Sequence, residues 1–386
     1  MLKKLQRVRL YVSILLIAVL STTVDLTVNA TGKAGIRDTG QTVTICMTGD
    51  MLLHDRVLDS GQKSDKSYCY DSIFLHMADQ IREADIAIVN EEVILGGTKL
   101  GLSGYPAFNG PFEVGDALVS SGFDVVCHGT NHALDKGTKG IKSCLNFWNT
   151  RYPQIAVLGI HNSQKSYDDI YIREEKGIRI AILNYTYGTN GIEIPSAMPY
   201  AVDLLEKKKV VSDLKRAQRE ADFVVVCPHW GTEYLHGISA EQEKWTAVFA
   251  ENGADLVLGT HPHVIEPVEM VKRPDGGYML VYYSLGNFVN ATSGTGKGTA
   301  DRMLGAMAQI TLKCKPDGAI EIADYDALPL ICHIAEGYGK ITVYPMDEYT
   351  EKLAQENEIR KQDQTFSLGY CQNLWTEVMG KDDIEK

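Results

Sequence analysis

The sequence predicts an α/β fold with mixed sheets, and two patterns in the chain support this prediction. Short apolar runs rich in β-branched residues alternate with amphipathic stretches of helical spacing, an order typical of α/β proteins. In addition, residues 170–185 and 308–325 have the pattern of antiparallel hairpins, turned at a Lys-Gly pair and a Pro-Asp-Gly run. Because parallel and antiparallel pairing are both expected, the sheets should be mixed.

The alternation places the main elements along the chain. In chain order, strands are expected at residues 42–50, 84–92, 123–132, 222–231, 254–263 and 278–287. Helices are expected at residues 113–122, 141–151, 210–221 and 240–253. We expect one main domain over residues 31–345, followed by a peripheral segment at 346–386 that is charged and helical in pattern.

Composition and charge exclude some classes of protein. Hydrophobic residues make up 44% and charged residues 23% of the 386 residues, which is typical of an ordinary folded protein. The formal charge of −12 argues against nucleic acid as a partner, because nucleic-acid-binding proteins neutralise phosphates with clustered Lys and Arg. An anionic substrate would therefore need a local positive centre.

The N-terminus predicts export. Four basic residues within the first nine positions precede the apolar run LYVSILLIAVL, and a small polar stretch follows. This order is typical of a secretory signal peptide. If the segment is not cleaved, a longer apolar stretch could serve as a membrane anchor. We therefore interpret residues 1–30 as a signal peptide or N-terminal anchor, and the protein as secreted, at the cell surface or membrane-anchored.

Polar side chains stand at the end of every predicted strand. Open α/β sheets bind ligands beyond the carboxyl ends of their strands, so strands that are neighbours in space would bring these side chains into one site. The strand-end residues are Asp50, Asn90, Glu92, Asn131, His132, His229, Glu233, His261, His263, Ser284 and Asn287.

The run GTHPH ends an apolar strand with His261 and His263, separated by Pro262. Residues two apart on an extended segment point to the same side, so both imidazoles could face one cation. Pro262 limits the freedom of the backbone between them. A pair of surface histidines is the alternative, but the position directly after an apolar run favours a metal site.

Two carboxylates extend the predicted site. Asp50 follows Gly49, which allows a sharp turn, and Asp50 could be a ligand, the N-cap of a following helix, or both. Strand alternation puts Asn90 and Glu92 on one face. His54 could face the same way if its segment is helical.

Imidazole and amide groups complete it. Asn131 offers an amide oxygen, and the neighbouring His132 could donate a proton to a leaving oxygen. His229 is either a ligand or a core histidine, and Trp230 beside it is expected to shield the site from water. Four further residues are predicted to support the ligands: His54, Asn90, Glu233 and Asn287.

The ligand types point to particular metals. The inventory contains carboxylates, an amide and imidazoles but no thiolate cluster, which suits Mn²⁺, Fe²⁺ or Zn²⁺ better than a structural zinc site. This number of ligands exceeds what one catalytic zinc needs. Two ions about 3.5–4 Å apart are the natural arrangement for activating water and binding a phosphoryl oxygen, so one or two divalent ions are expected.

With these residues in order, the chain resembles the poly-γ-glutamate capsule synthesis proteins of the CapA type, members of the calcineurin-like metallophosphatase superfamily. The resemblance covers about residues 42–344. It rests on the following motifs, in this order: GDMLL, NEEVI, GFDVVCHGTNHALDKG, CPHWGTEY, GADLVLGTHPHVIEPVE and YSLGNFV.

The resemblance implies a four-layer α/β/β/α sandwich, with His132 as the catalytic proton donor. It implies six metal ligands: Asp50, Glu92, Asn131, His229, His261 and His263. The chain departs from the pattern in two places. Gly-Thr-Asn-His stands where the family commonly has Ala-Asn-Asn-His, and the Asp-x-His of the superfamily is reduced to Asp50. One metal position is therefore short of a ligand unless His54 or water fills it.

Three functions remain open at this level. The first is assembly or export of poly-γ-glutamate, beside membrane-bound partners in capsule synthesis. The second is a metal-dependent phosphoesterase of the cell envelope. The third is a metal-dependent hydrolase of γ-glutamyl or related amide bonds. In each case the expected partner is poly-γ-glutamate or another anionic substrate of the envelope, because a preserved site alone does not name its substrate.

Overall fold

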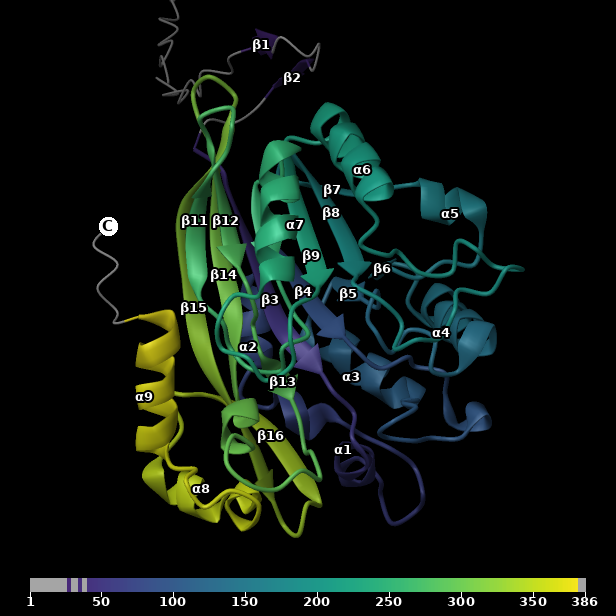
Figure 1. Cartoon of the computed structure of the whole chain (residues 1–386), viewed down its shortest axis with the longest axis vertical. Helices are drawn as coiled ribbons and strands as arrows, with labels where there is room; N and C mark the ends of the chain where they lie inside the picture. The colour runs from purple at the N-terminus through teal and green to yellow at the C-terminus, as the bar shows by residue number, and fades with distance from the viewer. Residues whose placement is uncertain (1–25, 29–33, 37–39, 381–386) are drawn as a thin grey trace, which may run out of the picture.

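The predicted α/β class with mixed sheets is confirmed. The computed structural model describes residues 26–28, 34–36 and 40–380, in which two large sheets pack face to face with helices around them (Figure 1). Most of residues 1–30, predicted as a signal peptide or anchor, lies outside the described residues. No helix in the described ranges is long and apolar enough to span a membrane.

The larger sheet has eight strands in the order β16-β15-β14-β3-β4-β5-β6, with β13 paired to β3. Its half from β3 to β6 is parallel, and its half from β14 to β16 is antiparallel. The strands are β3 (Thr42–Met51), β4 (Ile86–Glu91), β5 (Val125–Cys127), β6 (Ala156–Leu158), β13 (Asn287–Val289), β14 (Leu304–Cys314), β15 (Ile320–Ala335) and β16 (Lys340–Pro345).

The second sheet has six strands in the order β11-β12-β10-β9-β8-β7. Its four central strands are parallel, and each edge strand is antiparallel to its neighbour. The strands are β7 (Tyr171–Glu175), β8 (Ile178–Thr186), β9 (Phe223–His229), β10 (Leu256–Leu258), β11 (Val268–Lys272) and β12 (Tyr278–Tyr282). Both predicted hairpins are present, as β7–β8 and as β14–β15. A short separate ladder joins β1 (Leu26–Val28) to β2 (Ala34–Ile36).

Helices cover the outer faces of both sheets. They are α1 (Asp55–Ser60), α2 (Ala78–Glu83), α3 (Phe112–Ser121), α4 (Gly137–Arg151), α5 (Gln164–Asp168), α6 (Lys207–Glu220), α7 (Ala240–Glu251), α8 (Glu351–Glu356) and α9 (Leu368–Met379). Short 3₁₀ helices occur at η1 (Asp71–Phe74), η2 (Thr98–Leu100), η3 (Ala300–Met303) and η4 (Glu358–Lys361). The four helices predicted from the sequence correspond to α3, α4, α6 and α7.

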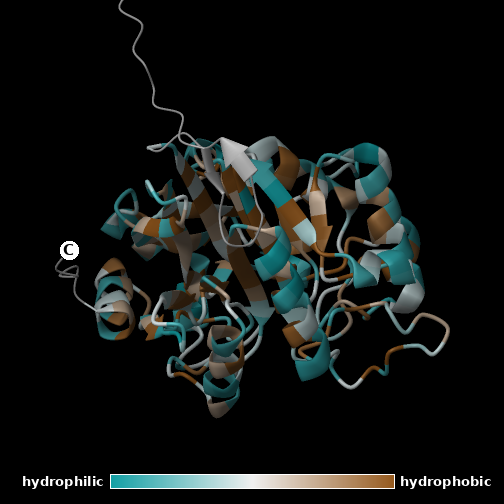
Figure 2. Ribbon diagram, turned by 90° about the horizontal axis from the view of Figure 1, so that it is seen from above, coloured by the Kyte–Doolittle hydropathy of each residue, from teal (hydrophilic) through white to brown (hydrophobic). Residues whose placement is uncertain are grey.

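Two hydrophobic clusters account for this layering. A smaller cluster packs α6 and α7 onto one face of the six-stranded sheet, with Leu214 and Phe249 among its fully buried side chains. The larger cluster fills the space between the sheets and continues under α3 and α4. Every residue of β4 is buried, so both faces of its sheet are covered. In Figure 2, hydrophobic residues concentrate on the strands and hydrophilic residues on the outer helices and loops.

The C-terminal segment predicted at residues 346–386 contains α8 and α9 within its described part. It packs onto the larger sheet, and Tyr349, Phe366 and Cys371 are buried in the same core as the strands. The segment therefore shares the hydrophobic core of the main domain.

The topology brings the carboxyl ends of strands from both sheets to one place. The parallel strands β3, β4 and β5 end there in the larger sheet, and β9 and β10 end there in the smaller one. An isolated bridge between His229 and Thr260 continues the pairing of β9 and β10 into the loops. Each predicted ligand lies at or just after the end of one of these strands.

Candidate metal centre

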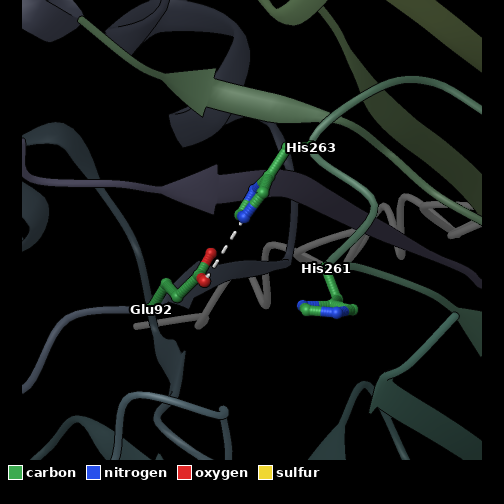
Figure 3. A group of neighbouring side chains, drawn as sticks. All are labelled: Glu92, His261 and His263. Carbon is green, nitrogen blue, oxygen red and sulfur yellow. Dashed lines mark ion pairs between the residues drawn. The ribbon is translucent and has the colours of Figure 1, made fainter. Parts of the chain in front are cut away.

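The side chains of the predicted ligands converge in the protein interior. Glu92, His261 and His263 form one group in which a ligand atom of each lies within 4.8 Å of the others, and Asp50, Glu92 and His229 form a second such group. Figure 3 shows Glu92 and His263 pointing toward each other, with the His261 ring beside them. Because Glu92 belongs to both groups, the two groups form one continuous cluster.

Asp50 lies at the end of β3 and is fully buried. Its carboxylate accepts hydrogen bonds from Asn90 Nδ2 (2.8 Å) and from the backbone N–H of His261 (3.2 Å), and it lies 3.1 Å from His263 Nδ1. The expectation of a helix N-cap at Asp50 is wrong, because the strand continues to Met51 and α1 begins only at Asp55.

The glycine before Asp50 also has a different role from the predicted turn. Gly49 lies within β3, and a Cβ at this position would come 1.9 Å from the carbonyl oxygen of Gly286. The same carbonyl accepts a hydrogen bond from the backbone N–H of Asp50 at 2.9 Å. Gly49 therefore allows a neighbouring loop to approach the strand closely enough to fix Asp50.

Glu92 is the central carboxylate of the cluster. It follows β4 and is fully buried, and neither of its carboxylate oxygens has a hydrogen-bond partner in the described chain. Its Oε1 lies 3.6 Å from His263 Nε2, 3.7 Å from His229 Nε2 and 4.0 Å from His132 Nε2. A carboxylate that is taken out of water without hydrogen bonds requires positive charge nearby.

The histidine at the end of β9 is held on both ring nitrogens. His229 Nε2 lies 3.0 Å from Asn131 Oδ1, and its Nδ1 lies 3.1 Å from Thr260 Oγ1. The prediction that Trp230 shields the site is wrong. Its side chain packs in the outer core against Phe249 of α7 and donates to a backbone carbonyl.

The two histidines of GTHPH face the cluster, but not for the predicted reason. The segment is not extended, because β10 ends at Leu258 and both histidines have positive φ, +102° for His261 and +61° for His263. Non-glycine residues rarely adopt this conformation, and such backbone strain concentrates at functional sites. The ring of Tyr187 covers His261 at 4.6 Å between centroids.

Charge interactions shift the pKa values of the cluster in opposite directions. Burial opposes ionisation of Glu92, but the surrounding histidines, led by His263 and His229, outweigh this effect and hold its pKa below the usual value. Burial and the nearby Glu92 raise the pKa of Asp50. Burial also opposes the charge on His263, yet Glu92 and Asp50 raise its pKa to about 9. Burial, reinforced by the neighbouring histidines, holds the pKa of His261 well below its usual value.

The predicted proton donor His132 lies at the edge of the cluster. Its Nδ1 donates to Asp135 Oδ2 at 2.7 Å, and Phe108 packs edge-on against the ring at 4.6 Å. Asp135 therefore fixes the ring so that Nε2 faces Glu92.

The four supporting residues lie at different distances from the cluster. Asn90 donates to Asp50, and Asn287 lies 3.1 Å from His263 Nδ1 through its Oδ1. His54 is half-buried with its ring 5.4 Å from Phe108, and burial lowers its pKa to about 4. Glu233 is exposed in the loop after β9, outside the buried cluster.

Sequence reasoning missed several residues that touch the cluster. Asp135 lies three residues after His132, a spacing that could have indicated the pair. Thr260 lies within the quoted GTHPH run. Asn190 gave no such signal, because it reaches His132 and Asn131 from a distant loop, with contacts of 3.4 Å and 3.2 Å. Tyr187 covers His261 from the same loop.

The donor set fits a divalent cation. The unpartnered oxygens of Glu92 and the unpartnered Nδ1 of His261 are buried atoms that metal coordination would satisfy. Carboxylate and imidazole donors together suit Mn²⁺, Fe²⁺ or Zn²⁺. The structure therefore contains buried groups with the composition and spacing of a divalent-metal site.

Comparison with known families decides which proteins share this arrangement. The model of the family described as bacterial capsule synthesis protein PGA_cap matches residues 44–292, a range that includes every predicted ligand. The chain belongs to this family. Within the PGA_cap family, it is similar to the capsule biosynthesis protein CapA of Bacillus anthracis, with 28% identity over 263 residues that make up 64% of this chain and 59% of the relative.

A second CapA relative gives a similar picture. The PGA biosynthesis protein CapA of Bacillus subtilis (strain 168) is 30% identical over 210 residues, which are 54% of this chain and 52% of that protein. The PGA_cap chain thus spans between half and three-fifths of the length of these relatives.

Solved structures resemble the PGA_cap chain more distantly. The 5'-nucleotidase precursor from Thermus thermophilus has a TM-score of 0.47 and 14% identity, over 75% of this chain and 54% of that one. The NAD nucleotidase of Haemophilus influenzae also has a TM-score of 0.47 and 14% identity, over 78% of this chain and 59% of that one.

Proposed function

We propose that this PGA_cap protein is a metal-dependent hydrolase that acts in poly-γ-glutamate capsule synthesis or export on the extracytoplasmic side of the membrane. The observation that carries the proposal is Glu92: a fully buried carboxylate without hydrogen bonds, surrounded by imidazoles at 3.6–4.0 Å. Such an arrangement costs stability in a protein that has no use for a cation. Family membership and the names of the relatives support the link to the capsule.

The ligands would come from five loops and strand ends. Glu92 would bind through its unpartnered oxygens, and His263, His261, His229, Asp50 and Asn131 would supply the remaining donor atoms. When bound, a divalent cation lowers the pKa of water and polarises the oxygen of the bond to be cleaved. Asn90 and Thr260 would keep Asp50 and His229 oriented, since each already contacts its partner.

Proton transfer falls to His132. Its Nδ1 is held by Asp135, which leaves Nε2 facing the cluster as the atom that holds or gives a proton. Phe108 covers one side of the ring and limits its access to water. His132 would therefore protonate the leaving group, as a general acid positioned by a carboxylate.

The cellular setting of the proposal comes from the N-terminal sequence. Basic residues followed by an apolar run would export the chain or anchor it in the membrane, where membrane-bound capsule synthesis partners and the anionic polymer would be within reach. The negative net charge means that binding of a polyanion must rely on local cations.

A direct test is to incubate purified protein with Mn²⁺ and γ-linked glutamate polymer and to follow chain length and the release of new amino groups. Shortening that is lost in His229→Ala and retained in Lys208→Ala is the expected result, because Lys208 is exposed on α6, away from the cluster. Equal shortening by wild type and His229→Ala would refute the assignment of the site.

The second candidate is a phosphoesterase of the cell envelope. The two ligand groups that share Glu92 favour it, because two cations bridged by one carboxylate form a clamp suited to phosphoryl transfer. Hydrolysis of bis(4-nitrophenyl) phosphate under the same conditions, without any change in the γ-linked polymer, would select this function.

A further inference from the structure

Arg302 has a different environment from the other arginines in the described ranges. Those arginines each make a side-chain hydrogen bond or ion pair to a carboxylate, an amide or a backbone carbonyl; they are Arg56, Arg82, Arg151, Arg173, Arg179, Arg216, Arg219, Arg273 and Arg360. The guanidinium of Arg302 has no such partner within the described chain, and its Nε is buried without a hydrogen bond. Its one described side-chain partner is an aromatic ring.

That ring belongs to the mouth of the metal centre. The guanidinium carbon of Arg302 lies 3.7 Å from the ring centroid of Tyr234, and the Tyr234 ring lies 6.0 Å from the ring of His263. Tyr234 is 47% exposed, so this side of the cluster opens toward solvent. One aromatic ring therefore separates the arginine from a predicted metal ligand.

The backbone fixes this placement. Asn287 Nδ2 donates to the carbonyl of Arg302 at 3.0 Å, and Asn287 Oδ1 lies 3.1 Å from His263 Nδ1. Tyr234 is held by a 2.8 Å hydrogen bond from its N–H to the carbonyl of Pro262, between the two histidines. The arginine and the ring are thus tied to the same segments that carry the ligands.

Neighbouring acids do not neutralise Arg302. The adjacent Asp301 is engaged elsewhere, because its carboxylate accepts from Tyr370 of α9 and lies 3.3 Å from His236 Nε2. Glu233 stands beside Tyr234 but is exposed and makes no ion pair with Arg302 in the described chain. A partly buried guanidinium without an anion is uncommon, since charges removed from water are normally paired.

We propose that Arg302, held against Tyr234, binds a second anionic group of the ligand, a carboxylate or a phosphate, beside the group that reaches the metal centre. Stacking fixes the plane of the guanidinium, whose paired N–H groups match the two oxygens of such an anion. The subsite supplies the local positive centre that an acidic protein needs for an anionic substrate. This assignment rests on the proposed function, because it concerns another part of the same ligand.

Binding to the purified full chain with its metal can test the subsite without turnover. Isothermal titration calorimetry would measure the affinity for a γ-linked glutamate hexamer, which carries free carboxylates, and for inorganic pyrophosphate. Arg302→Gln should weaken one of these probes by about ten- to a hundredfold, the range for a lost charge-assisted contact. Arg302→Lys should recover part of the affinity, because charge remains without the planar fork.

Arg151→Gln is the matched control. Arg151 also stacks over a tyrosine, Tyr152, but at the end of α4 and paired with Asp116. It should bind both probes as wild type does, and metal content should be equal in all variants. Loss of the glutamate hexamer alone in Arg302→Gln identifies a carboxylate subsite, and loss of pyrophosphate alone identifies a phosphate subsite.

Two results would overturn the proposal: wild type that binds neither probe, or Arg302→Gln that binds both with unchanged affinity. The outcome is separable from that of the proposed function. Arginine-dependent binding without hydrolysis of either substrate leaves the subsite in place and rejects the hydrolase. Hydrolysis with an affinity indifferent to Arg302 does the reverse.

Discussion

Replacing Glu92 with glutamine should remove metal binding and leave the metal-free fold nearly as stable as wild type. Glutamine has the same shape as glutamate but no charge. In wild type, the Glu92 carboxylate is fully buried without hydrogen bonds, and its nearest charged partner, His263, lies 3.6 Å away. The substitution therefore removes both a desolvation cost and an attraction to the imidazoles.

The expected magnitudes follow from these two terms. Without metal they oppose each other, because a buried ion pair contributes little net stability and His263 can lose its proton when its partner is neutral. We expect the free energies of unfolding of wild type and Glu92→Gln to agree within about 1 kcal/mol in chelator. With free metal at about a hundred times its Kd, wild type should gain about 2.7 kcal/mol, and the variant should gain nothing.

Urea unfolding with EDTA and with Mn²⁺ measures both differences in one experiment. Lys208→Ala should follow wild type in both conditions, because Lys208 is exposed and distant from the cluster. If Glu92→Gln gained as much stability from Mn²⁺ as wild type, Glu92 would not be a ligand. If it were several kcal/mol less stable in EDTA, the carboxylate would serve the fold instead of a cation.

Three further outcomes are expected. Asp135→Asn should lower kcat about ten- to a hundredfold at unchanged metal content, because the 2.7 Å charge-assisted bond to His132 is lost; steady-state kinetics showing wild-type kcat would exclude this role. Burial raises the pKa of Glu266 to about 8. Since this lies above the unfolded value, its contribution to stability falls as pH rises from about 4.5 through 8, so Glu266→Gln should gain on wild type by about 1.4 kcal/mol per pH unit between pH 5.5 and 7.5 in urea unfolding; a constant difference would contradict this. Gly49→Ala should destabilise the fold by at least about 1–3 kcal/mol, because its Cβ would lie 1.9 Å from the Gly286 carbonyl oxygen; an unchanged denaturation midpoint would show that the loop yields freely.

The sequence was sufficient for the fold class and for the membership of the cluster. Alternation of strands and helices predicts parallel pairing, and parallel strands end at one edge, so Asp50, Glu92, His229, His261 and His263 could be grouped without coordinates. Only the structure shows that they come from two different sheets. Strand order depends on long-range packing, which periodicity does not report.

Local backbone geometry was less accessible. The pattern predicted an extended His261-Pro262-His263 segment, whereas both histidines adopt positive φ, which no propensity rule anticipates for a non-glycine residue. Trp230 was expected beside the metal ligands but faces the opposite side of its sheet, in contact with α7. Arg302 left no signal, because its meaning lies in a missing partner, which a sequence cannot reveal.

The most direct test of the metal centre is an anomalous difference map from a crystal grown with Mn²⁺. The account predicts a peak in contact with Glu92 and with His261 and His263 or with Asp50 and His229, and no peak there in crystals of Glu92→Gln. A wild-type crystal with no peak in the cluster, or with its metal bound elsewhere on the chain, would contradict the central claim.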